Sequence, residues 1–141
     1  MFNTIMALLI LNIAVEVGVP PYFALSIALE ENWNLDPGAI SQPNENGTID
    51  RGIMQLNSRY FDIDWRDPEI NIRTGCILIK SLIRNPEINT YWAVAVAYNC
   101  GYTRFVSEEG PPSASIDYGC RVMMRWLELQ GLKYINPIIR K

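Results

Sequence analysis

The sequence contains no histidine, and this absence excludes more functions than any other feature of its composition. Without histidine, Ser-His-Asp and Cys-His catalysis and the common histidine-based metal sites are ruled out. No Gly-rich phosphate-binding loop of the GxxxxGK or GxGxxG kind occurs either. Any chemistry must therefore come from carboxylates, tyrosines, amides or thiols, and we expect neither a cofactor nor a metal ion.

Positive charge is also scarce. The chain has 12 Lys and Arg against 15 Asp and Glu, a net charge of −3, and its basic residues form no cluster. A protein that binds nucleic acid normally carries a basic patch that contacts the phosphates. We therefore expect no nucleic-acid partner.

Only three cysteines are present, Cys76, Cys100 and Cys120, and they lie far apart in the sequence. Zinc sites usually need closely spaced pairs, which are missing here. Free cysteines are among the most often buried residues, so we interpret the three as small core side chains. A disulfide between Cys100 and Cys120 stays open, because spacing does not establish its geometry.

The first 19 residues are apolar, but they lack the basic segment and cleavage site of a signal peptide. Asn3, Asn12 and Glu16 make this stretch a poor membrane span. We interpret it as a buried first helix and keep a signal or anchor as the alternative. With 141 residues and no repeat or long linker, the chain is predicted to be a single domain, residues 1–141.

The fold expected from the pattern is mostly α, with at most one small β-hairpin. Pro21 can open a helix, and so can the Asp67-Pro68 pair, while Gly18 and Gly131 are typical of helix ends. Residues 33–52 are rich in turn-forming side chains, with a tight turn expected at residues 44–47. The predicted helices span residues 3–17, 21–31, 67–84, 89–99 and 113–129, the last beginning at Ser113 or Ser115.

Glu30 is the first candidate for chemistry, because it ends an otherwise apolar helix beside Trp33. Burial disfavours a charged carboxylate, so this position predicts a raised pKa for Glu30. Cleavage of a glycosidic bond needs such an acid, one that still holds its proton near neutral pH. On periodicity alone, an ordinary solvated glutamate is the more frequent alternative.

Three short segments favour the catalytic interpretation. They are Ala-Leu-Glu-Glu-Asn-Trp-Asn at residues 28–34, Gly-Ile-Met-Gln-Leu-Asn at residues 52–57 and Ala-Tyr-Asn-Cys-Gly at residues 97–101. In this order they resemble the signatures of soluble lytic transglycosylase domains, which have a lysozyme-like fold and cleave peptidoglycan. Each segment alone is a weak signal, and the ordered set is a strong one.

Two further elements extend the resemblance. Residues 67–75, with Asp-Pro followed by Asn-Ile and Gly75, are similar to the family's Asp-Pro…Asn-Ile-x-x-Gly helix. Ser115-x-x-Tyr118 is similar to its late Thr-x-x-Tyr element. The resemblance covers roughly residues 20–118.

The resemblance implies roles for individual residues. Glu30 would be the general acid and base. The residues implied to contact or enclose the sugar are Met54, Gln55, Asn57, Tyr98, Asn99 and Tyr118. For Tyr98 and Tyr118, core packing is the alternative. The sequence departs from the family at Glu31, where a Ser is usual; helix neighbours point about 100° apart, so only one glutamate can face the cleft.

A second resemblance concerns Asp50. Residues 47–61 also resemble the β-hairpin segment of animal-type lysozymes, in which this position holds a second catalytic carboxylate. Retaining hydrolysis requires such a carboxyl pair. Some small transglycosylases also keep an acidic residue there, and a role in tightening the turn is a further alternative. The Tyr98-Asn99-x-Gly101 motif and the low cysteine number favour the transglycosylase.

The function expected is therefore a lytic transglycosylase that cleaves the β-1,4 MurNAc–GlcNAc bond and leaves 1,6-anhydroMurNAc ends. A hydrolytic lysozyme using Glu30 and Asp50, and an inactive glycan-binding domain, are the alternatives. The partner implied is the glycan strand of peptidoglycan, and the place of action is the bacterial cell wall. Membership of a phage-tail or secretion assembly stays open.

Overall fold

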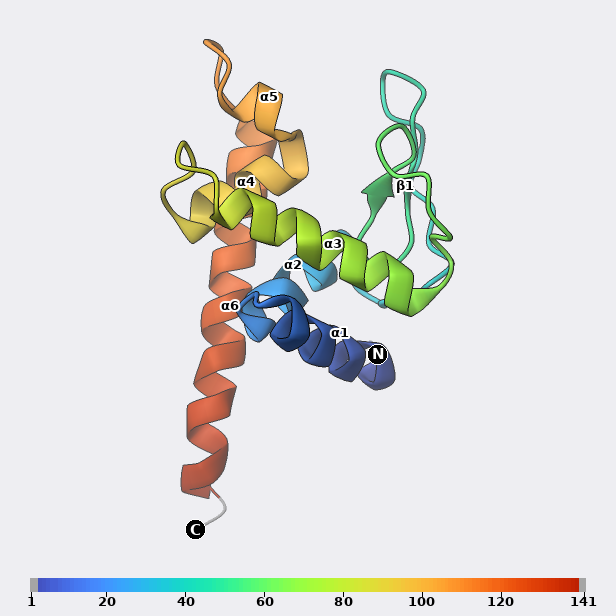
Figure 1. The fold of residues 1–141 in the computed structure, drawn as a ribbon. Helices are drawn as coiled ribbons and strands as arrows, with labels where there is room; N and C mark the ends of the chain where they lie inside the picture. Colours follow the sequence, from blue (N-terminus) through green and yellow to red (C-terminus); the bar gives the residue numbers. More distant parts are fainter. Residues whose placement is uncertain (1–2, 140–141) are drawn as a thin grey trace. The chain divides into compact units, whose positions relative to one another are not determined.

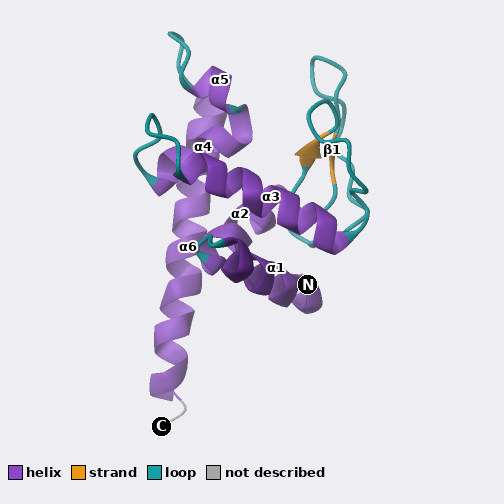
Figure 2. Ribbon diagram, viewed as in Figure 1, coloured by secondary structure: helices purple, strands orange, loops and turns teal. Residues whose placement is uncertain are grey.

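The computed structural model describes residues 3–139, with side chains described up to residue 131. It is mostly helical, with one small antiparallel pair of strands, which confirms the predicted fold class (Figure 2). The chain divides into two compact units, residues 1–80 and residues 81–141.

The first unit begins with two helices that pack against each other, α1 (Thr4–Val17) and α2 (Pro21–Glu31) (Figure 1). The Asn3 side chain caps α1 by accepting the Met6 N–H at 3.2 Å. The helix ends at Gly18, which adopts the left-handed conformation with φ 89°. Pro21 then opens α2, where its missing N–H costs no helical hydrogen bond. Both predicted helices are confirmed.

The prediction that the first helix is buried is only partly right. One face of α1 lies in the core, whereas Ile5, Leu8 and Val15 are 73%, 56% and 66% exposed. The core face is formed by Ala7, Ile10, Ile13 and Ala14. Within residues 3–139, no helix has both the length and the apolar character that crossing a bilayer requires.

A small β-hairpin follows the loop after α2. Strand β1 (Asp50–Arg51) pairs antiparallel with β2 (Leu56–Asn57), so that Asp50 stands opposite Asn57. The turn predicted at residues 44–47 is confirmed, since the Gly47 N–H donates to the Asn44 carbonyl at 2.8 Å. That turn leads into β1, whereas the chain reverses between β1 and β2 at residues 52–55.

Helix α3 (Pro68–Ile83) begins where the sequence predicts it and ends one residue earlier. Asp67 caps it by accepting the Ile70 N–H at 3.1 Å. Its buried residues recur at helical spacing and form one apolar stripe. They are Ile72, Cys76, Ile79 and Leu82.

The second unit is built on α4 (Tyr91–Cys100), which packs against α6 (Ser113–Ile139), with a short helix α5 (Tyr102–Phe105) between them. Thr90 caps α4 by accepting the Ala93 N–H at 3.1 Å. The helix therefore starts two residues later than predicted, because the capping side chain is Thr90 and not an earlier polar residue. The sequence did not predict α5.

The predicted end of the last helix is wrong. The helix continues through Gly131 to Ile139 and does not stop at Leu129. A glycine ends a helix when it adopts positive φ, and Gly131 is not among the glycines that do. Inside a helix, glycine costs only about 1 kcal/mol relative to alanine, which does not by itself end it.

The cysteines are unpaired, and they differ in exposure. Cys76 is buried, Cys100 is half-buried and Cys120 is exposed. The interpretation of all three as core side chains is therefore wrong for Cys120, which lies on the solvent side of α6.

Candidate active site

Glu30 lies in the last turn of α2, directly after seven consecutive buried residues, 23–29. Its own side chain is half-buried, as is that of Glu31. The next residue ends the helix, because the Asn32 N–H donates to the Ala28 carbonyl at 2.8 Å. An anion at this position meets the negative end of the helix dipole, which disfavours a charged carboxylate there. The geometry thus places a carboxyl group at the border between an apolar helix and solvent.

Asp50 is held by the side-chain amides of two asparagines. The Asn57 Nδ2 donates to its Oδ1 at 3.1 Å, and the Asn44 Nδ2 lies 3.4 and 3.5 Å from its two oxygens. Both amides also donate to the Thr48 hydroxyl, at 3.0 Å from Asn57 and 3.1 Å from Asn44. Amide N–H groups are suitable donors for an ionised carboxylate. We call Asn44, Thr48 and Asn57 the Asp50 cradle.

The turn between the two strands is strained and is fixed by its own side chain. Gln55 adopts φ 51°, which is unusual for a residue other than glycine. Its Nε2 donates to the Gly52 carbonyl at 2.8 Å and lies 3.4 Å from the Ala39 carbonyl. Such strain persists only where the surrounding structure enforces it, and it concentrates at functional sites. The prediction that Gln55 contacts sugar stays a prediction.

Met54 and Asn71 join the same turn to α3. Asn71 is 0% exposed, and its Oδ1 accepts the Met54 N–H at 2.8 Å. Its Nδ2 donates to the Arg51 carbonyl at 3.1 Å. A Cβ at Gly75 would lie 2.7 Å from the Met54 Cγ, so only glycine fits against that side chain. Met54 is itself 0% exposed, and its predicted contact with sugar stays a prediction.

In the second unit, the structure brings Asn99 together with a residue that the sequence analysis did not place in the site. The Ser115 hydroxyl, at the start of α6, donates to the Asn99 Oδ1 at 2.7 Å. Of the two predicted tyrosines, Tyr98 is half-buried on α4 and Tyr118 is 4% exposed on α6. The sequence singled out Ser115 only through the Ser115-x-x-Tyr118 motif, and that motif does not predict its hydrogen bond to Asn99.

Two of the thiols are unsuited to nucleophilic chemistry at neutral pH. Burial raises the pKa of Cys76 to about 12, although the charge of Arg73 opposes the shift. Burial also raises the pKa of Cys100, against a weaker opposing effect of its hydrogen bond with Ser115. Because the thiolate is the reactive form, these two side chains stay inert. Cys76 and Cys100 therefore do not compete with the carboxylates as candidates for catalysis.

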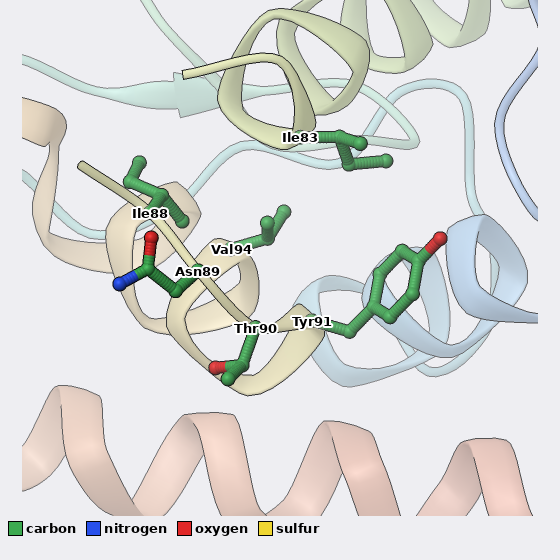
Figure 3. Close-up of a pocket in the computed structure, with 6 residues that line it drawn as sticks. All are labelled: Ile83, Ile88, Asn89, Thr90, Tyr91 and Val94. Atoms are coloured by element: carbon green, nitrogen blue, oxygen red, sulfur yellow. The ribbon is translucent and has the colours of Figure 1, made fainter. Parts of the chain in front are cut away.

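A small pocket opens at the start of α4 in the second unit (Figure 3). Its volume is about 220 Å³, below the roughly 300–1,000 Å³ typical of small-molecule sites. Its lining residues are Ile83, Ile88, Asn89, Thr90, Tyr91 and Val94. None of the predicted site residues is among them, so this pocket gives no support to the proposed chemistry.

Comparison with known proteins gives one family assignment. No curated protein matches the chain, and no solved structure does. Residues 9–118 match the family model described as the transglycosylase SLT domain, a lysozyme-like family that acts on the peptidoglycan of the cell wall. The match includes all of the residues predicted to form the site, from Glu30 to Tyr118. The chain therefore belongs to the transglycosylase SLT domain family.

Proposed function

We propose that the protein is a lytic transglycosylase that cleaves the β-1,4 bond between MurNAc and GlcNAc, with Glu30 as its catalytic acid and base. The observation that carries the proposal is the half-buried carboxyl group of Glu30, at the end of an otherwise buried helix, inside a chain of this family. A carboxyl group at such a border can keep its proton until a glycosidic oxygen accepts it.

The reaction begins when Glu30 donates its proton to the glycosidic oxygen. The bond from that oxygen to the anomeric carbon of MurNAc breaks, and GlcNAc leaves with a new hydroxyl group. Glu30, now a carboxylate, accepts the proton of the 6-hydroxyl of the same MurNAc as its oxygen attacks the anomeric carbon. The product is a 1,6-anhydro ring, and no water is consumed. The internal nucleophile is favoured by its proximity.

Asp50 supports this reaction as a charged neighbour. Its carboxyl group accepts hydrogen bonds from the amides of its cradle, and a carboxylate there stabilises positive charge that develops at the anomeric carbon. The same observation favours a second candidate, the hydrolytic lysozyme, in which Asp50 acts as nucleophile or ion stabiliser and water completes the reaction.

The remaining predicted residues are proposed to bind the sugars. Amide groups suit dense sugar hydroxyls, and tyrosine rings suit the apolar faces of the sugar rings. Those proposed to contact or enclose the glycan are Met54, Gln55, Asn57, Tyr98, Asn99 and Tyr118. The proposed reaction consists of proton transfers at Glu30 and attack by the 6-hydroxyl of the sugar, so we propose no cofactor.

Digestion of purified peptidoglycan, followed by mass spectrometry of the fragments, tests the proposal. We expect fragments with anhydro ends, each lighter by one water than the fragment with a free reducing end. Glu30→Gln should abolish their release, because an amide cannot donate the proton, whereas Glu31→Gln should retain it. Reducing ends alone would establish the hydrolase. Full activity of Glu30→Gln combined with loss in Glu31→Gln would place the catalytic acid one residue later.

Asp50→Asn distinguishes the two reactions kinetically. In a transglycosylase, loss of one electrostatic contact should slow turnover by at most about 10²-fold. A hydrolase that needs the Asp50 carboxylate as nucleophile should lose about as much activity as Glu30→Gln does. Initial rates of both variants on the same peptidoglycan give the comparison, and equal losses would contradict the transglycosylase.

A further inference from the structure

Ser115 makes an unusual hydrogen bond for a serine in the first turn of a helix. Such a hydroxyl commonly bonds to backbone groups of its own helix end. Here the hydroxyl donates to the Asn99 Oδ1 at 2.7 Å, across 16 positions of sequence. Ser115 is 4% exposed, while Asn99 is exposed at the end of α4. A buried hydroxyl thus holds one end of an exposed amide.

The backbone beneath that amide is also fixed. Helix α4 ends at Cys100, one residue after Asn99, and the Gly101 N–H donates to the Ala97 carbonyl at 2.8 Å. Gly101 adopts φ 86°, a conformation that favours glycine. The backbone position of Asn99 is therefore set by the helix end. Its side chain keeps two rotations, about the Cα–Cβ bond and about the Cβ–Cγ bond, and the second of these turns the amide over.

That rotation decides which chemical group Asn99 presents. One end of the amide is an acceptor oxygen and the other carries two N–H donors, and the rotation between them is loosely restrained. With the oxygen held by Ser115, the Nδ2 points away from that contact, and it makes no hydrogen bond with any side chain or backbone group described for residues 3–131. Asn99 is thereby prepared to act as a donor.

We propose that Ser115 is a positioning residue that holds the Asn99 oxygen, so that Asn99 offers its N–H groups to an oxygen of the bound glycan strand. An acetamido carbonyl or a ring hydroxyl of the sugar supplies such an oxygen. The inference rests on the proposed function, in which Asn99 contacts the glycan. It adds a residue that does not itself touch the sugar.

A matched pair of variants isolates the hydroxyl. Ser115→Thr keeps the donor, whereas Ser115→Val has nearly the same shape as threonine and lacks it. One hydrogen bond lost should lower kcat/KM on peptidoglycan by roughly five- to tenfold in Ser115→Val. Ser115→Thr should stay close to wild type. Thermal unfolding of each variant shows whether the fold is retained.

Ser115→Val made in an Asn99→Ala background tests whether Ser115 acts through Asn99. We expect Ser115→Val to cause no further loss there, since the amide that it positions is gone. Losses that multiply in the double variant would show that Ser115 acts elsewhere and would overturn the proposal. Equal rates of Ser115→Thr and Ser115→Val would also overturn it.

Asn99→Asp gives an independent readout that needs no change at Ser115. The aspartate can still accept a hydrogen bond from the Ser115 hydroxyl, but it presents a second oxygen where asparagine presents N–H donors. It should lose as much activity as Asn99→Ala, and full activity would refute the donor role even if Ser115→Val fails to fold. If wild type releases no fragments at all, the proposed function fails and this inference with it. If wild type is active and the Ser115 and Asn99 variants are as active as wild type, this inference fails while the proposed function stands.

Discussion

Asn71 provides the sharpest test of how the hairpin is supported. Its side chain is 0% exposed and makes two hydrogen bonds to the strand region, accepting from the Met54 N–H and donating to the Arg51 carbonyl. Asn71→Ala removes both partners at once and leaves a buried N–H without an acceptor. The substitution therefore acts on the turn that carries β1 and β2, and not on the helix that Asn71 occupies.

The expected loss follows from these contacts. Two hydrogen bonds have a net value of about 1 kcal/mol each, and a buried N–H left without a partner adds about 1–3 kcal/mol. We expect the free energy of unfolding to fall by about 3–5 kcal/mol in total. With an unfolding entropy of about 2.1 cal/mol/K per residue, this lowers the Tm of a chain of 141 residues by about 10–17 °C.

Thermal unfolding followed by circular dichroism measures the effect. Asn71→Asp keeps the volume of the side chain but turns an oxygen toward the Arg51 carbonyl, so it should destabilise the protein as well. Asn89→Ala is the matched control, because Asn89 is exposed and should change stability by less than about 0.5 kcal/mol. A Tm for Asn71→Ala within 2 °C of the control would refute this account of the turn.

Three further predictions concern packing and ionisation. Gly75→Ala should destabilise the protein by about 1–3 kcal/mol in chemical denaturation, because the new Cβ would meet the Met54 Cβ at 2.8 Å, close to the backbone where it cannot swing away. Burial raises the pKa of Cys76 to about 12 from an ordinary 9.0, so the unfolded chain ionises first and stability should fall as pH rises from 9 to 12. Cys76→Ala should lack the loss of stability that ionisation of Cys76 causes at alkaline pH. Parallel Tm curves of wild type and variant between pH 8 and pH 11 would contradict this prediction. A thiol reagent should modify Cys120 rapidly in the native protein and Cys76 only on unfolding, so equal rates at both would argue against the described burial.

Local signals in the sequence predicted most of the first unit. Asn3 and Asp67 cap their helices with their own side chains, and Gly18 ends α1 in the left-handed conformation. Each of these effects depends on a few consecutive residues, so the sequence is sufficient to predict it. Gly131 shows the limit, because a glycine can end a helix or continue it, and its local sequence does not decide between them.

The sequence proposes the members of the candidate site, which stay a prediction, and it does not predict the contacts that these residues make. The bonds that hold Asp50 come from Asn57, its cross-strand partner, and from Asn44, the first residue of the turn at residues 44–47. The bond to Asn99 comes from a serine 16 positions away. Such contacts depend on strand register and helix packing, which residue spacing alone does not specify. Ser115 was therefore visible in the sequence only as part of a motif.

The physical contacts explain why two of the family's motifs occur together. The segment at residues 52–57 needs a buried acceptor for the Met54 N–H and a close approach of α3, and residues 71–75 supply both through Asn71 and Gly75. These residues do not take part in the proposed proton transfer. They fix a strained turn beside the strand that carries Asp50, and the strain at Gln55 is maintained only while that support is intact. Much of the family signature in this chain is therefore a requirement of packing, and the case for catalysis depends on Glu30, whose replacement by glutamine should remove activity without disturbing the contacts between residues 52–57 and α3.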